Sequence, residues 1–254
     1  MACILCVPRS GMGDFLYPME ITNWLVTGAS IIWLVVAFLF YGKTHQDHHF
    51  DWVRFISRVA IFGAISTILY IVPVFQIQLP FVPSFLQLHF DEIPAFIAGY
   101  AYGPWTAIAV LFIKSVIKLP MSTTLCVGEL CDFLYSTAFI LPAALIYKKH
   151  RNLKGVAWGF LVGTILQLIV SSVMNAWVML PFYVKVYSGL TMDILLAMCQ
   201  AVNPAIKNLT WDYILYVNLP FNLIKDGLVL AVTFLVYRSI HKILHFDRAP
   251  KSLH

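Results

Sequence analysis

Long, almost uncharged apolar runs recur along this chain, and they limit its fold more than any other feature. A membrane-spanning helix needs roughly 20 mostly apolar residues, and the run 22–41 has that length. The composition agrees, because 60% of the 254 residues are hydrophobic and only 11% are charged, whereas soluble domains carry roughly 25% charged residues. A water-soluble fold of this size has too little interior to bury so much apolar surface. The sequence therefore predicts an all-α protein that crosses a membrane several times.

The apolar runs divide into seven predicted membrane segments: 22–41, 54–75, 92–102, 105–119, 127–147, 155–180 and 212–243. The third and fourth are too short to cross a bilayer alone, and Gly103-Pro104, a strong helix breaker, separates them. Short, interrupted segments at membrane depth occur where protein or a cavity surrounds them. We therefore expect a binding site near 80–128, and we expect the long loop 181–211 to cover it as a lid.

The basic residues predict the orientation, because cytoplasmic loops of membrane proteins are enriched in Lys and Arg. Most of the 17 Lys and Arg residues fall on one side of a seven-span topology, in the loops at 43–58 and 148–154 and at the C-terminal end. This arrangement puts the C-terminus in the cytoplasm and the N-terminus outside. The same topology assigns five basic residues to the outer side: Arg9, Lys114, Lys118, Lys185 and Lys207. The membrane topology thus explains how the basic residues are distributed along the chain. No basic stripe typical of a nucleic-acid-binding protein is visible.

Small residues at four-residue spacing predict where helices touch, because close backbone approach favours helix association in lipid. Gly155, Gly159 and Gly163 form one such repeat, and we expect it to pack inside the protein. Ala60 and Ala64 form another. That pair suits either internal packing or contact with another subunit.

Lys225 is the sharpest single signal of function. A lysine inside a membrane helix costs roughly 2.5–3.5 kcal/mol on insertion scales, so it usually faces a cavity or a partner. Asn222 lies three residues earlier on the same helix face, so the two side chains offer an amide and a cation to a ligand. Two structural interpretations stay equally open: a lysine that extends to the outer interface, or an ion pair with Asp91, Glu129 or Asp132.

Other polar residues near or inside the apolar segments are weaker candidates. Glu129 follows a Ser-Thr-Thr run at the start of its helix, where hydroxyls and free backbone amides suit a polar ligand, although ordinary helix capping is the better explanation of this pattern alone. Asp91 and Glu92 are likewise expected to cap the next helix start. Asn175 lies in the middle of its segment and needs a partner, either another helix or a ligand.

The sequence contains no motif typical of a hydrolase nucleophile, a nucleotide-binding loop or a zinc protease. Cys3 and Cys6 form a CxxC, but no second CxxC follows it, so unpaired thiols are predicted. We therefore expect no enzyme activity, no bound metal and no resident cofactor.

Several motifs, taken in order, resemble those of the riboflavin-binding S components of energy-coupling-factor (ECF) vitamin transporters. They are LHFDEIPA (88–95), GYAYGP (99–104), STT followed by VGEL (122–130), FILPAALIY (139–147), NAWVMLPFY (175–183), NPAI (203–206) and PFNLIK (220–225). The resemblance extends from 54 to 243. It implies a six-helix S-component core at 51–245, preceded by an extra transmembrane helix within 1–50 and followed by a cytoplasmic tail at 246–254.

The resemblance also implies a function. Such a subunit captures riboflavin, with FMN as a further candidate ligand, outside a bacterial cell and delivers it through a membrane coupling subunit and two ATPases. Riboflavin is then a transported ligand rather than a cofactor, and the partner subunits use the ATP. The family's alanine motif, which contacts the coupling subunit, corresponds to Ala60 and Ala64. The family's ligand contacts correspond to Asn175, Asn222 and Lys225 and, more weakly, to Thr124, Leu125 and Glu129.

Two alternatives stay open on the sequence. S components for other vitamins share the fold and the alanine motif, so the ligand is open between riboflavin and another vitamin. A membrane-embedded enzyme or a stand-alone channel is a different class. The missing catalytic motif argues against an enzyme, and the lack of repeated pore-lining polar residues argues against a channel.

Overall fold

A computed structural model describes residues 51–80, 82–83, 86–122, 126–187 and 189–244. The predicted helix 22–41, the rest of 1–50 and the tail 246–254 lie outside these residues, as do the candidate ligand residues Thr124 and Leu125. The described part consists of helices and connecting loops, with one antiparallel bridge between Ile77 and Leu88. The predicted all-α fold is confirmed for this part of the chain.

The helices follow the predicted membrane segments within a few residues. Their bounds are α2 Trp52–Ile71, α3 Glu92–Tyr102, α4 Pro104–Lys118, α5 Val127–Lys149, α6 Leu153–Met174, α7 Leu180–Val186, α8 Met192–Val202, α9 Trp211–Tyr213 and α10 Leu219–Leu244. The 3-10 turns η1 (Pro73–Phe75) and η2 (Leu119–Met121) follow α2 and α4. The π-helical turns η3 (Asn175–Met179) and η4 (Ile214–Asn218) connect α6 to α7 and α9 to α10.

Five helical stretches in the described part of the chain are long and apolar enough to cross a membrane. They are Trp52–Ile71, Pro104–Met121, Val127–Lys149, Lys154–Val186 and Trp211–Val236. Together with the shorter α3 they make up the six helices expected for the core.

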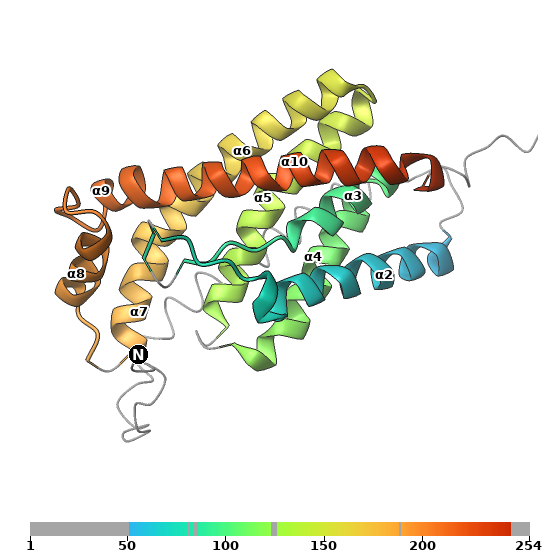
Figure 1. The fold of residues 1–254 in the computed structure, drawn as a ribbon. Helices are drawn as coiled ribbons and strands as arrows, with labels where there is room; N and C mark the ends of the chain where they lie inside the picture. The colour runs from blue at the N-terminus through green and yellow to red at the C-terminus, as the bar shows by residue number, and fades with distance from the viewer. Residues whose placement is uncertain (1–50, 81, 84–85, 123–125, 188, 245–254) are drawn as a thin grey trace, which may run out of the picture.

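The short helix α3 lies inside the bundle (Figure 1). It packs against α2, α4, α5 and α10, and each of its residues from Glu92 to Ala101 is buried. The Phe96 ring anchors it, with its centroid 4.7 Å from that of Phe139 on α5, which in turn lies 4.9 Å from that of Phe160 on α6. A helix of 11 residues is too short to cross a hydrocarbon core of about 30 Å. The prediction that protein surrounds this segment is confirmed.

The backbones of α5 and α6 pack closely because of the predicted glycine repeat. A Cβ atom at Gly159 would lie 2.8 Å from the backbone oxygen of Ala143, and one at Gly163 would collide with the backbone oxygen of Phe139. Gly155 instead faces the backbone of His150, just before α6. The expectation that this repeat packs inside the protein is therefore confirmed.

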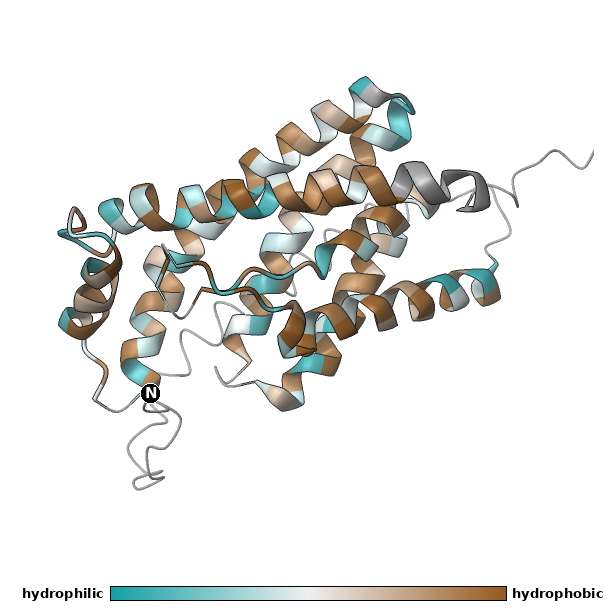
Figure 2. Ribbon diagram, in the orientation of Figure 1, coloured by the Kyte–Doolittle hydropathy of each residue, from teal (hydrophilic) through white to brown (hydrophobic). Residues whose placement is uncertain are grey.

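Hydrophobic residues make up most of the length of the long helices, and hydrophilic residues are frequent at the turn between α5 and α6 and at the start of α2 (Figure 2). Ile61, Ile65 and Ile68 on α2 are exposed, as is Ile169 on α6. Exposed tryptophans lie near the helix ends, at Trp52, Trp158, Trp177 and Trp211. Tryptophan is enriched where membrane helices meet the water interface. The surface therefore fits a bundle whose long helices cross a bilayer.

The segment 181–211 is largely helical, which corrects its prediction as a long loop. The end of α7 and the whole of α8 lie within it. Leu195 and Cys199 are four residues apart on α8, and they pack in one buried cluster with Ile206 and Tyr213. The turn-forming residues Gly189 and Asn203-Pro204 flank this helix. Their strong turn signal is the reason that the sequence argument missed its short apolar stripe.

Candidate functional site

An ion pair inside the bundle joins three helices. Lys225 Nζ on α10 donates a hydrogen bond to Glu92 Oε1 on α3 at 2.8 Å. Ser136 Oγ on α5 donates to the same oxygen at 2.9 Å. All three residues are buried. Lys225 therefore forms a structural ion pair, as one sequence interpretation held, but its partner is none of the three acids considered for it.

A second buried ion-pair group lies beside the first. Lys114 on α4 pairs with Asp91 and, at 3.0 Å, with Asp132 on α5. Lys114 is fully buried within α4, inside the predicted segment 105–119. The expectation that Asp91 and Glu92 cap α3 was wrong, because Asp91 occupies the cap position without a side-chain hydrogen bond to the helix. Buried lysines need carboxylate partners, and these two acids supply them.

A network of side-chain amides connects α6 to α10. Asn218 Oδ1 accepts hydrogen bonds from Asn175 Nδ2 at 3.1 Å and from Asn222 Nδ2 at 2.9 Å. Asn218 Nδ2 donates to Ser172 Oγ at 3.1 Å, and Gln167 Nε2 donates to Asn222 Oδ1 at 3.0 Å. The structure thus brings together Asn175 and Asn222, which the sequence argument singled out separately, and it does so through Asn218.

Two polar stripes on facing helices build this network. Residues three or four apart lie on one helix face, and both sets keep that spacing: Thr164, Gln167, Ser171 and Asn175 on α6 and η3, and Asn218, Asn222 and Lys225 on η4 and α10. Asn175 begins one π-helical turn and Asn218 ends the other, and such turns are frequent at functional sites. The sequence argument missed Asn218 and Gln167, although this spacing was available to find them.

Glu129 forms a separate contact at the start of α5. Ser122 Oγ donates to Glu129 Oε2 at 2.6 Å and accepts from the backbone N–H of Cys126 at 2.9 Å. Cys126 adopts a left-handed conformation with a φ of 70°. The hydroxyl of Ser122 thus connects Cys126 to Glu129 in the first turn of α5, whereas the side chain of the N-cap residue Cys126 makes no capping hydrogen bond.

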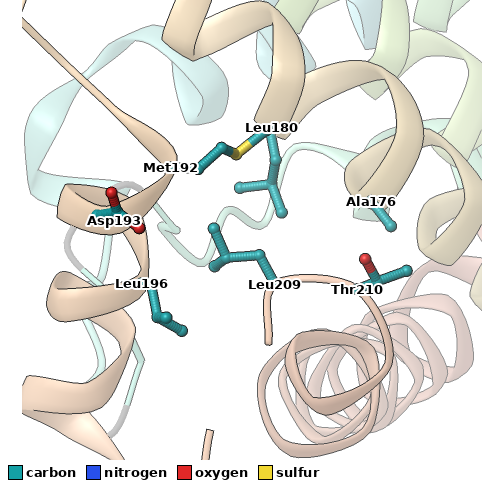
Figure 3. A pocket seen from close by; sticks show the side chains of 7 residues that line it. All are labelled: Ala176, Leu180, Met192, Asp193, Leu196, Leu209 and Thr210. Atoms are coloured by element: carbon teal, nitrogen blue, oxygen red, sulfur yellow. The ribbon is translucent and has the colours of Figure 1, made fainter. Parts of the chain in front are cut away.

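A pocket of about 300 Å³ lies between α8 and the stretch formed by η3 and α7 (Figure 3). Its lining consists of Ala176, Leu180, Met192, Asp193, Leu196, Leu209 and Thr210. Most of these side chains are apolar, and the predicted ligand residues are not among them. Ala176 directly follows Asn175, so the pocket borders the amide network without including it.

Ala60 and Ala64 lie on the outer face of α2, where both are exposed. Exposed isoleucines at 61 and 65 lie beside them. The alternative that this pair packs inside the described bundle is therefore wrong. The two small residues therefore form an exposed face on α2 that another helix can approach closely.

Known proteins show the same fold and related sequences. The family "ECF transporter, substrate-specific component" matches residues 54–237. The riboflavin transporter RibU of Staphylococcus aureus (strain TCH60) is 29% identical over 189 residues, which cover 74% of this chain and 92% of that protein. The riboflavin transporter FmnP of Bacillus subtilis (strain 168) is 32% identical over 182 residues, which cover 70% of this chain and 88% of that protein.

A solved structure described as "Structure and mechanism of the S component of a bacterial ECF transporter" has 26% sequence identity to this chain and a TM-score of 0.59. The match covers 76% of this chain and 99% of that one. The family match spans all six core helices, and the relatives are named as transporters rather than enzymes. This chain therefore belongs to the family of substrate-specific components of ECF transporters.

Proposed function

We propose that this protein is the riboflavin-capturing subunit of a bacterial ECF importer. The observation that carries the proposal is the amide network of the half-buried Asn175 with the buried Asn218 and Asn222, with Lys225 on the same face of α10. The relatives named as riboflavin transporters support the choice of ligand. The edge of the flavin ring alternates carbonyl acceptors with an imide donor, which suits amide side chains and a lysine. A flat ring also needs apolar walls and a few convergent polar groups.

The hydrogen bonds of the network explain how a flavin edge fits these residues. Asn218 Oδ1 is a carbonyl oxygen that accepts from Asn175 and Asn222. These bonds hold the two amides in place, and the carbonyl oxygens of Asn175 and Asn222 each keep a lone pair with which to accept the imide N–H of a flavin ring. We assign the principal ligand contacts to Asn175, Asn222 and Lys225. Glu129, Thr124 and Leu125 are assigned weaker contacts on the family resemblance.

The proposed transport cycle requires partner subunits. Riboflavin enters from the outer side, and a membrane coupling subunit with two ATPases drives its release inside. Ala60 and Ala64 are assigned to the contact with the coupling subunit, because both are exposed on α2 and small residues allow close helix approach. The protein lies in the bacterial cell membrane, with the N-terminus outside and the C-terminus in the cytoplasm, as the basic residues predict. Residues 51–245 form the ligand-binding domain, and 1–50 and 246–254 are additions to it.

Riboflavin binding by the purified protein tests this function. We expect riboflavin fluorescence to be quenched on addition of the detergent-solubilised protein and to saturate at one flavin per chain. FMN, thiamine and biotin serve as comparison ligands in the same preparation. A folded protein that carries no yellow chromophore and quenches no riboflavin would overturn the proposal. Binding of thiamine or biotin instead would assign the protein to another vitamin.

A further inference from the structure

We infer that Glu92 and Ser136 are positioning residues that hold the Lys225 ammonium group where a flavin ring is bound. This inference rests on the proposed function, and it adds two residues that the sequence argument did not assign to the site. Glu92 lies on α3, Ser136 on α5 and Lys225 on α10. Three separate helices therefore meet at one carboxylate oxygen, Glu92 Oε1, which accepts from both other residues.

A lysine needs residues that fix the position of its ammonium group, because its side chain is long and flexible. Its four-carbon stem allows the ammonium to reach several places, including the membrane interface. Glu92 and Ser136 are fully buried, so neither competes with bulk water for its contacts. The carboxylate draws the ammonium to one point, and the serine hydroxyl holds the carboxylate there.

The neighbouring acids do not serve Lys225 in the same way. Asp91 and Asp132 both bind Lys114 on α4. Glu92 is therefore the carboxylate that the described contacts assign to Lys225. Each buried lysine thus has its own carboxylate partners, and these partners determine where its ammonium group lies.

This pairing changes how a Lys225 variant is to be interpreted. Removing one partner of a buried ion pair leaves an uncompensated charge and destabilises the fold strongly, whereas replacing both partners is far milder. Lys225→Met alone therefore combines two effects, loss of a ligand contact and an unpaired Glu92. The double variant Glu92→Gln/Lys225→Met separates them, because it removes the ligand contact together with both charges of the ion pair.

The experiment compares the wild type with Glu92→Gln, Lys225→Met and the double variant, in detergent. Thermal unfolding is measured without ligand, and riboflavin affinity by fluorescence quenching. We expect Lys225→Met to lower the unfolding midpoint and the double variant to recover most of that loss without recovering affinity. Glu92→Gln alone is expected to weaken riboflavin binding about tenfold, the loss of one charge-assisted hydrogen bond. In the Lys225→Met background the same change is expected to leave the residual affinity unchanged, because Glu92 acts through Lys225.

Ser136→Ala and Thr137→Val form a matched pair on α5. Both hydroxyls are buried, but Ser136 donates to Glu92 whereas Thr137 donates to the backbone oxygen of Phe133. We expect Ser136→Ala to weaken riboflavin binding about threefold, less than a hydrogen bond to a charged group is worth, because Ser136 acts on Lys225 only through Glu92. Thr137→Val is expected to bind as the wild type does. Glu92→Asp, which keeps the carboxylate, is expected to bind better than Glu92→Gln.

Several outcomes would overturn the inference while leaving the proposed function standing. One is a Glu92→Gln protein that binds riboflavin as tightly as the wild type. Another is an equal loss of affinity from Glu92→Gln with and without Lys225, which would make Glu92 independent of the lysine. A double variant no more stable than Lys225→Met would contradict the pairing itself. A wild-type protein that binds no riboflavin would instead overturn the proposed function together with this inference.

Discussion

Asn218 connects the two amides to which we assign ligand contacts. It is fully buried, and its amide group accepts from Asn175 and Asn222 while donating to Ser172. A buried amide left without partners costs about 1–3 kcal/mol, so these bonds fix the orientation of each side chain. At the scale of single residues, Asn218 therefore determines how the neighbouring amides face a ligand.

Asn218→Leu tests this role with a side chain of similar size that accepts no hydrogen bond. We expect riboflavin affinity to fall about tenfold, since two neutral hydrogen bonds together are worth about 1–3 kcal/mol. Flavin fluorescence titration measures the change. Ser172→Ala is the control, because it removes one donor contact of Asn218 and leaves the shared acceptor in place. Wild-type affinity in Asn218→Leu would show that Asn218 does not orient the site.

The close contact of α5 and α6 positions the polar stripe on α6. Gly159 and Gly163 allow the α6 backbone to lie against Ala143 and Phe139 of α5. Gln167 and Asn175, which belong to the amide network, follow these glycines along the same helical stretch. At the scale of elements, the glycine repeat therefore determines how far α6 stands from α5, and hence where the α6 stripe meets α10.

Gly163→Ala is expected to destabilise the protein, because the added Cβ meets the backbone oxygen of Phe139, which has little room to move. Overpacking of this kind costs about 1–3 kcal/mol, measured as a lower midpoint of thermal unfolding in detergent. Gly227→Ala is the matched control in α10, since nothing lies within 4 Å of its added Cβ. Alanine is better than glycine inside a helix by about 0.5–1 kcal/mol, so the control is expected to be equally or more stable. Equal midpoints for the two variants would contradict the packing argument.

Ligand binding and partner contact occupy different parts of the whole molecule. The polar network lies inside the bundle between α6 and α10, whereas Ala60 and Ala64 lie on the outer face of α2. The helix α2 packs against α3 and α4 (Figure 1), and isoleucines at 56, 61, 65 and 68 are exposed on its surface. A change on the outside of α2 is therefore expected to affect assembly without reaching the ligand.

Ala64→Trp is expected to abolish riboflavin uptake by the assembled transporter while leaving riboflavin binding by the isolated subunit within about twofold of wild type, since a bulky ring prevents close helix approach. Uptake by cells and fluorescence titration measure the two activities. Ile169→Trp on the exposed face of α6 is the control, because it adds the same ring to another lipid-facing helix. It is expected to leave both activities intact. Normal uptake by Ala64→Trp would remove this face of α2 from the proposed interface.

The positions of the helices were predictable from sequence because a membrane helix satisfies its own backbone hydrogen bonds, so that an apolar run of sufficient length marks it locally. The segments 92–102 and 127–147 agree with α3 and α5 to within two residues. The confinement of α3 to the interior followed from its length and its Gly-Pro boundary. The prediction of a long loop at 181–211 was wrong because the apolar stripe of α8 is short, and the turn-forming residues around it gave the stronger sequence signal.

The partners of the buried charges were decided by the tertiary structure alone. Glu92 and Lys225 are 133 residues apart, and each had several possible partners of opposite charge. Lys114, which the sequence argument counted with the basic residues of the outer side, lies fully buried against Asp91. Sequence spacing determines which side chains share a helix face, as for Asn222 and Lys225. Which faces then meet depends on the packing of all the helices, because a buried charge must find its partner on whichever helix lies next to it.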